Sequence, residues 1–137
     1  MSAGTLVDSN VLLDILTEDP DWFDWSNEAL SAAAEAGPLY INPLIYAEVS
    51  VGFSRIEDLE DALPPADFRR AALPWAAAFL AGKAFLSYRR SRGAASAPLP
   101  DFLIGAHAAV ADLALLTRDT SRYRTYFPTV RLVVPEK

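Results

Sequence analysis

The 137-residue sequence contains no cysteine and a single histidine, His107. The lack of cysteine excludes disulfide scaffolds, thiolate metal sites and cysteine nucleophiles. One histidine cannot form a two-histidine zinc site, and it argues against a Ser-His-Asp relay. Basic residues are also few, because 12 Lys and Arg face 18 Asp and Glu and give a net charge of -6. This balance excludes binding of nucleic acid through a broadly basic surface, but not through acids that hold a cation, since a bound ion reverses the local charge.

Long apolar runs and a targeting segment are missing as well. The longest apolar stretch, residues 71–81, contains Pro74 and falls short of the roughly 20 residues that a membrane helix needs. The first residues carry neither a cationic segment nor an apolar h-region, so they do not read as a secretory signal. Hydrophobic residues make up 52% of the chain, which is enough for one core. We therefore expect a single domain over residues 1–137 that is soluble and cytoplasmic, with no membrane partner.

Short apolar segments alternate with helical ones along the chain. This alternation predicts an α/β fold, and strands without polar alternation are typical of a sheet covered on both faces. The expected architecture is a three-layer α/β/α sandwich with a small, mainly parallel central sheet. The predicted strands are 5–7, 39–41, 113–117 and 130–134. The predicted helical segments are 9–16, 22–36, 43–52, 56–63, 67–92 with a kink at Pro74, 102–112, and a turn at 121–127, and a loop is expected over 93–100.

Four acidic residues fall at the ends of these elements. Asp8 follows the first strand, and Asp119 follows the third. Asp101 opens the helix that leads into the third strand, and Glu48 lies a little over one turn inside the helix after the second. Ligands of open parallel sheets bind beyond the carboxyl ends of the strands, where the amino ends of antiparallel crossover helices also lie. We therefore expect all four carboxylates at one rim.

Four carboxylates at one rim repel one another, so either their pKa values rise or a cation neutralises them. Carboxylate oxygens suit hard ions such as Mg²⁺ or Mn²⁺, which also bind substrate phosphate. Such an ion can activate water and offset charge during in-line displacement at phosphorus. Phosphodiester hydrolysis is the chemistry that this pattern favours.

Four sequence segments together resemble the PIN-domain ribonucleases, specifically the VapC-type toxins of bacterial toxin–antitoxin pairs. The first is LVDSNVLL at 6–13, and the second combines Asn-Pro with Tyr-Ala-Glu over 42–48. The third is DFLIGAH at 101–107, and the fourth is LLTRD with Arg-Tyr over 115–123. Each segment is unspecific alone, but their order and spacing cover nearly the whole chain.

The resemblance implies a PIN-like fold, dependence on Mg²⁺ (or Mn²⁺), an RNA substrate, homodimerisation and inhibition by a cognate antitoxin. It also implies that one acidic set is both catalytic and metal-binding, with the first and third members as the most direct ligands: Asp8, Glu48, Asp101 and Asp119. Asn10 matches the polar residue that supports the first acid, and Ser9 stands where many relatives have Thr. Thr117 matches a hydroxyl next to the fourth acid.

Simpler roles compete for some of these residues. Asp8 and Asp101 could each cap or stabilise a helix start, and Asp119 could be an ordinary loop acid. Arg118 and Arg122 flank Asp119, where contact with RNA phosphate and simple charge balance are equal alternatives.

Other ionisable residues receive plainer interpretations. Asp14 and Glu18 are expected on a solvated helix face, and Asp112 at the opposite rim. His107 is expected to pack between helices or lie at the surface.

The leading hypothesis is a metal-dependent endoribonuclease toxin. One alternative is a phosphohydrolase similar to haloacid dehalogenases, although position 10 is Asn where those enzymes have a second Asp, and only Lys83 and Lys137 could supply their lysine. Another alternative is a non-catalytic module whose acidic rim binds a basic peptide. Antitoxin contacts are expected around residues 44–63.

Overall fold

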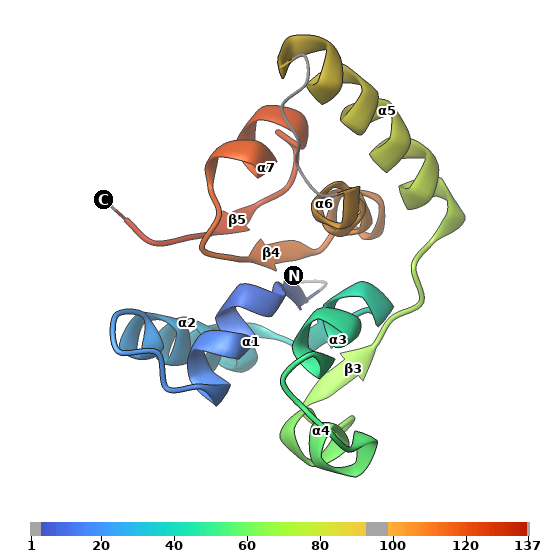
Figure 1. The fold of residues 1–137 in the computed structure, drawn as a ribbon. Helices are drawn as coiled ribbons and strands as arrows, with labels where there is room; N and C mark the ends of the chain where they lie inside the picture. The colour runs from blue at the N-terminus through green and yellow to red at the C-terminus, as the bar shows by residue number, and fades with distance from the viewer. Residues whose placement is uncertain (1–3, 93–98, 137) are drawn as a thin grey trace.

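A computed structural model describes residues 4–92 and 99–136 and contains a five-stranded, fully parallel sheet (Figure 1). The strands lie in the order β3-β2-β1-β4-β5. The predicted α/β class with a parallel sheet is therefore confirmed, but the prediction of four strands was wrong. The strands are β1 (Thr5–Val7), β2 (Leu39–Ile41), β3 (Phe68–Arg70), β4 (Ala114–Leu116) and β5 (Leu132–Val133).

The unexpected strand is β3, which lies within the predicted helix 67–92. Its central residue Arg69 is in register with Tyr40 of β2. Two of its three residues are arginines, so the sequence has no apolar run there that would predict a strand. The strand forms because the segment pairs with β2. The helix predicted there, α5, begins only at Trp75 and ends at Arg92.

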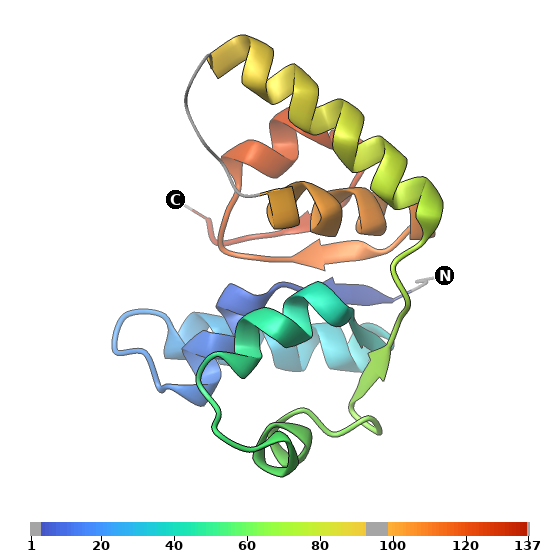
Figure 2. The same ribbon diagram turned by 45° about the vertical axis from the view of Figure 1, so that its right-hand side comes forward.

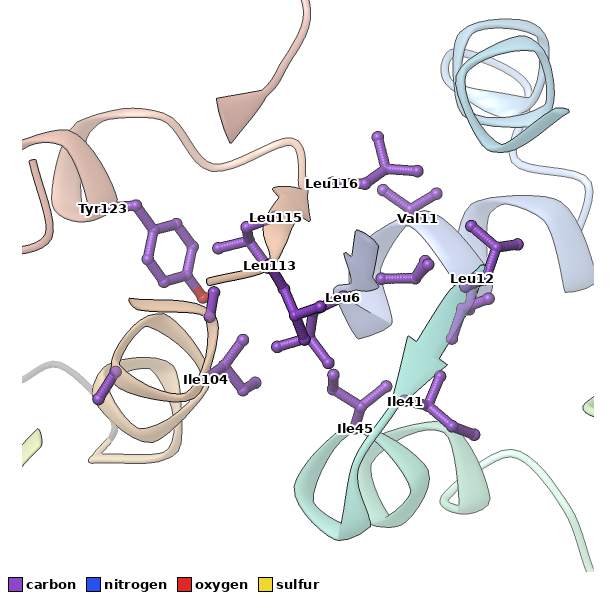
Figure 3. Close-up of a cluster of buried hydrophobic side chains, with 14 of the residues drawn as sticks. Leu6, Val11, Leu12, Ile41, Ile45, Ile104, Leu113, Leu115, Leu116 and Tyr123 are labelled. Carbon is purple, nitrogen blue, oxygen red and sulfur yellow. The ribbon is translucent and has the colours of Figure 1, made fainter. Parts of the chain in front are cut away.

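Helices cover both faces of the sheet, which confirms the three-layer sandwich. In Figure 3, α1 and α2 lie on one side of β1, β2 and β4, whereas α3 and α6 lie on the other. The long helix α5 packs along α6 (Figures 1 and 2). None of the helices in the described part of the chain is long and apolar enough to cross a membrane. Besides α5 they are α1 (Ser9–Leu16), α2 (Phe23–Ala36), α3 (Pro43–Ser50), α4 (Ile56–Ala62), α6 (Leu99–Ala111) and α7 (Ser121–Tyr126).

Local sequence explains how two of these helices begin. The side chain of Asn42 accepts a hydrogen bond from the backbone N–H of Ile45 at 2.9 Å, and Pro43 occupies the first position of α3. Asn caps and first-turn prolines both favour a helix start. Helix α6 begins at Leu99, earlier than predicted, so Pro100 lies in its first turn rather than in a loop. Residues 93–98 of the predicted loop lie outside the described residues.

The core lies on both sides of the central strands. Leu115 and Leu116 are adjacent on β4 and both fully buried. Figure 3 shows Leu115 on the side of Tyr123 and Leu116 on the side of Val11. Successive strand residues point to opposite faces, so a strand covered twice must be apolar throughout. This explains why the strand segments show no polar alternation.

A cluster of aromatic rings joins α5, α6 and α7. The ring of Phe102 on α6 lies 5.3 Å from that of Tyr88 on α5 and 5.6 Å from that of Tyr126 on α7. Gly105 permits this packing, because a Cβ atom there would lie 2.5 Å from Cδ2 of Phe127. The close approach of Phe127 to α6 fixes α7, which carries residues of the candidate site.

Candidate acidic active site

The site lies at the point where the strand order reverses. The chain runs from β1 through β2 to β3 on one side, and then crosses to β4 and β5 on the other. Parallel sheets bind ligands at the carboxyl ends of the strands that flank such a reversal. Here these strands are β1 and β4, joined by a 2.9 Å hydrogen bond from Asp8 N to Leu116 O. Asp8 and Thr117, the residues that follow the two strands, therefore stand side by side.

Asp8 is the buried centre of the site, with 5% of its surface exposed. Its Oδ1 atom accepts from the backbone N–H of Ser9 at 2.8 Å, so Asp8 does cap α1. Its Oδ2 atom accepts from the hydroxyl of Thr117 at 2.8 Å and from that of Tyr123 at 3.2 Å. Burial nevertheless raises the pKa of Asp8, and the nearby charge of Glu48 adds to the rise. Capping and a chemical role are thus compatible at this residue.

Glu48 reaches the site from α3. Its Oε1 atom accepts from the hydroxyl of Ser9 at 2.7 Å. Glu48 is the sixth of the eight residues of α3, a little over one turn inside the helix, as the sequence predicts. Helix α3 packs against α1, and this contact places Glu48 over the first turn of α1.

Thr117 connects three parts of the site. Besides donating to Asp8, its hydroxyl accepts from Asn10 Nδ2 at 3.2 Å and from the backbone N–H of Asp119 at 3.1 Å. The Oδ1 atom of Asn10 accepts from the backbone N–H of Arg118 at 3.2 Å. Asn10 therefore connects α1 to the segment after β4. These contacts are those of a positioning residue, and they differ from the role of the second Asp in a haloacid dehalogenase.

The carboxylates of Asp101 and Asp119 both form an ion pair with the guanidinium of Arg122. Nη1 of Arg122 lies 2.6 Å from Oδ2 of Asp101 and 3.3 Å from Oδ2 of Asp119. Asp101 stands in the first turn of α6. Burial raises the pKa of Asp101, the charges of Asp8 and Asp119 raise it further, and Arg122 opposes the rise. The structure thus brings Asp8, Asp101 and Asp119 close enough for their charges to interact, with Glu48 near Asp8 and with Arg122 paired to Asp101 and Asp119.

The donor chemistry of this cluster fits a divalent cation. The oxygens come from carboxylates, which Mg²⁺ and Mn²⁺ prefer. Burial raises the pKa values of Asp8 and Asp101, and the charges of neighbouring carboxylates add to the rise. Within residues 4–92 and 99–136, however, no three His, Cys, Asp or Glu side chains are already arranged around a common ion position. Arg122 lies between two of the acids instead.

Tyr123 is a component of the site that the sequence did not indicate. It is 1% exposed, and its hydroxyl donates to Asp8. Burial and the neighbouring carboxylates raise its pKa, so the hydroxyl keeps its proton and remains a donor. The residue forms part of the Arg-Tyr pair at 122–123, but an aromatic residue in a short helix gives no sign that its hydroxyl faces an acid.

The environment of Asp14 differs from the prediction. Instead of lying on a solvated face, Asp14 is 3% exposed. It accepts from Nε of Arg118 at 2.7 Å, from Nη2 at 2.9 Å and from the hydroxyl of Ser26 at 2.6 Å. The guanidinium of Arg118 also lies 4.8 Å from the ring centroid of Trp22. Two arginines were considered for phosphate contact. Arg118 is bound to Asp14 and packs on Trp22, whereas Arg122 contacts Asp101 and Asp119 of the candidate site.

The plainer interpretations hold for two other residues. His107 is 1% exposed, and its Nδ1 lies 3.0 Å from Nδ2 of Asn42, so it packs between α6 and α3. Burial lowers the pKa of His107. Asp112 is exposed at the end of α6, just before β4 begins, and this places it at the amino edge of the sheet, opposite the acidic rim.

A parallel α/β sandwich with an acidic cluster at its reversal point defines a recognisable class of protein. The PIN domain family model matches residues 5–128. The chain therefore belongs to the PIN-domain family.

The fold is shared with solved structures of low sequence identity. One is VapBC2 from Rickettsia felis bound to a fragment of its promoter DNA, with a TM-score of 0.70, 17% identity and coverage of 95% of this chain and 97% of the other. FitAcB from Neisseria gonorrhoeae has a TM-score of 0.70 and 19% identity, with coverage of 93% of this chain and 95% of the other. A toxin–antitoxin complex from Klebsiella pneumoniae has a TM-score of 0.62 and 24% identity, with coverage of 88% of this chain and 90% of the other. No curated protein sequence matches the chain.

Proposed function

We propose that this protein is a Mg²⁺- or Mn²⁺-dependent endoribonuclease that acts in the cytoplasm as a VapC-type toxin. The observation that carries the proposal is the convergence of four carboxylates from separate elements on the reversal point of the sheet, with the guanidinium of Arg122 paired to two of them. The structural likeness to a toxin–antitoxin complex supports a cognate antitoxin as partner. A homodimer belongs to the same proposal, on the strength of the family resemblance.

The proposed ion site would consist of Asp8 and Asp101, with Glu48 and Asp119 beside them. When bound there, the ion would offset phosphate charge and make a water molecule more acidic. The remaining contributions come from the protein itself. Ser9 and Thr117 hold the two oxygens of Asp8 in a fixed orientation, which spares the site reorganisation during the reaction.

Glu48 is suited to orient the attacking water. One of its oxygens is held by the hydroxyl of Ser9, so Oε2 is left to accept a proton from a water molecule near Asp8. Tyr123 remains protonated and supplies a constant donor to Asp8. Arg122 is the residue placed to contact the phosphate, because Arg118 is bound to Asp14.

Cleavage of structured RNA by purified variants tests the proposal. We expect Asp8→Asn and Asp101→Asn to lower the cleavage rate by at least about 100-fold, and a chelator to abolish cleavage by the wild type. Asp112→Asn is the matched control, since it makes the same chemical change at the opposite rim. Equal cleavage by all variants would mean a contaminating nuclease or another site. Parallel assays with single-stranded DNA decide whether the substrate is RNA.

The toxin role requires a test in cells. Induced expression of the wild type should arrest growth, and expression of Asp8→Asn at the same level should not. A small protein encoded beside this one should relieve the arrest if it is the antitoxin. Normal growth with the wild type, despite cleavage in vitro, would contradict the toxin role while leaving the nuclease intact.

A further inference from the structure

We propose that Arg122 is an internal counter-ion that competes with the divalent cation for Asp101 and Asp119, and that binding of the cation releases its guanidinium. This inference rests on the proposed metal-dependent function. It concerns how the negative charges of that site are balanced when no ion is bound.

The contacts of Arg122 suit a competitor. A single nitrogen, Nη1, reaches Oδ2 of Asp101 at 2.6 Å and Oδ2 of Asp119 at 3.3 Å. The pairing is not the two-nitrogen fork by which arginine usually grips a carboxylate. The side chains of all three residues are between 24% and 33% exposed, so the contact can exchange with an ion from solution.

The remaining charges explain why a counter-ion is needed at this position. Burial and the charges of Asp8 and Asp119 all disfavour the ionised form of Asp101, and Arg122 opposes them. The arginine that follows β4, Arg118, cannot help because Asp14 holds it. An ion that takes the Oδ2 atoms of Asp101 and Asp119 competes with Arg122 for them, since two cations that share the same oxygens repel each other.

A cavity beside Arg122 can accommodate its side chain after release. A cavity of about 220 Å³ borders Arg122 and is lined by Tyr88, Ser121, Thr125 and Tyr126. The guanidinium already lies 5.9 Å from the ring centroid of Tyr88, a contact that attracts cations. Release would leave a tethered positive charge beside the acids at the moment when the ion arrives, available to the phosphate of the substrate.

Titration of the purified protein with Mn²⁺ by calorimetry tests this inference without using activity. We expect Arg122→Gln to bind Mn²⁺ about tenfold more tightly than the wild type, a change of about 1.4 kcal/mol. Arg122→Lys should give an intermediate affinity, because it keeps the charge on a different side chain. The control is Arg124→Gln, which removes the same charge from an exposed position on the same helix and should stay within about twofold of the wild type.

Thermal unfolding provides the second measurement. Without ion, Arg122→Gln should melt below the wild type, and saturating Mn²⁺ should raise its melting temperature by more than it raises that of the wild type. Equal or weaker Mn²⁺ binding by Arg122→Gln, relative to Arg124→Gln, would overturn the inference. If the wild type binds Mn²⁺ and Asp101→Asn does not, the proposed ion site stands even when the inference fails. Absence of Mn²⁺ binding in the wild type and in Arg122→Gln would overturn both.

Discussion

Asp14→Ala and Arg118→Ala remove opposite ends of one ion pair, and we expect them to destabilise the protein by different amounts. Asp14 is 3% exposed, whereas the side chain of Arg118 is 30% exposed. After Asp14→Ala the guanidinium can turn toward water. After Arg118→Ala the carboxylate remains buried with only the hydroxyl of Ser26 as donor. Leaving a buried charge without its partner is the more costly of the two changes.

The magnitudes follow from burial. Breaking a fully buried pair costs roughly 3–5 kcal/mol, and Arg118→Ala should reach the lower end of that range, about 3 kcal/mol, because it also loses the contact with Trp22. Asp14→Ala should cost about 1.5 kcal/mol, since solvent screens the exposed guanidinium. Urea denaturation measures both values, and each kcal/mol corresponds to roughly 4 °C in melting temperature. The double variant should show a coupling energy of about 1.5 kcal/mol.

An exposed ion pair on the same chain serves as the control. Arg55 and Glu57 lie 3.4 Å apart with side chains 65% and 66% exposed. Glu57→Ala should therefore change the free energy of unfolding by less than about 0.5 kcal/mol. Equal costs for Asp14→Ala and Arg118→Ala, or a cost below about 1 kcal/mol for Arg118→Ala, would refute the reasoning from burial.

Three further predictions concern packing, the site hydroxyl and pH. Gly105→Ala should destabilise the fold by about 1–3 kcal/mol, because its Cβ would lie 2.5 Å from a ring carbon of Phe127; an unchanged melting temperature would show that the ring moves aside freely. Tyr123→Phe removes a hydrogen bond that lowers the pKa of Asp8, so the acid limb of kcat/KM for RNA cleavage should shift to higher pH, and an unmoved limb would contradict this. Burial lowers the pKa of His107 below its usual 6.5, so its stabilisation is complete above pH 6.5 and is lost as the pH falls through the folded-state pKa. Urea denaturation between pH 7.5 and 5 should show this loss in the wild type relative to His107→Gln, and parallel pH profiles would count against it.

The sequence allows the position of an acid to be predicted where a strand end fixes it. Asp8 and Asp119 follow apolar runs that can only be buried strands, so their common rim follows from the topology of a parallel sheet. Glu48 lies further along α3, and its place beside Asp8 depends also on the packing of α3 against α1, which local sequence does not specify. The positions of the four acids at the ends of predicted elements indicated the set, and the family resemblance supported it, whereas the hydrogen bonds around them required the structure.

Contacts between distant residues account for what the sequence did not reveal. Asp14 resembles any surface acid of a short helix, and its burial is explained by its partners Ser26 and Arg118, the latter 104 residues further on. In the same way, β3 becomes a strand only by pairing with β2. Local propensity carries no information about such partners, since it reflects a residue and its near neighbours alone.

The sheet order has a consequence for the timing of synthesis. Because β1 pairs with β4, the hydroxyl of Thr117 contacts Asp8 although the two residues are 109 positions apart in the sequence. Non-local pairings of this kind form late, and a growing polypeptide presents its amino-terminal half first. An unfinished chain on the ribosome therefore carries Asp8 without Thr117 and Tyr123, so the hydrogen bonds of the candidate site form only after β4 and α7 have been synthesised.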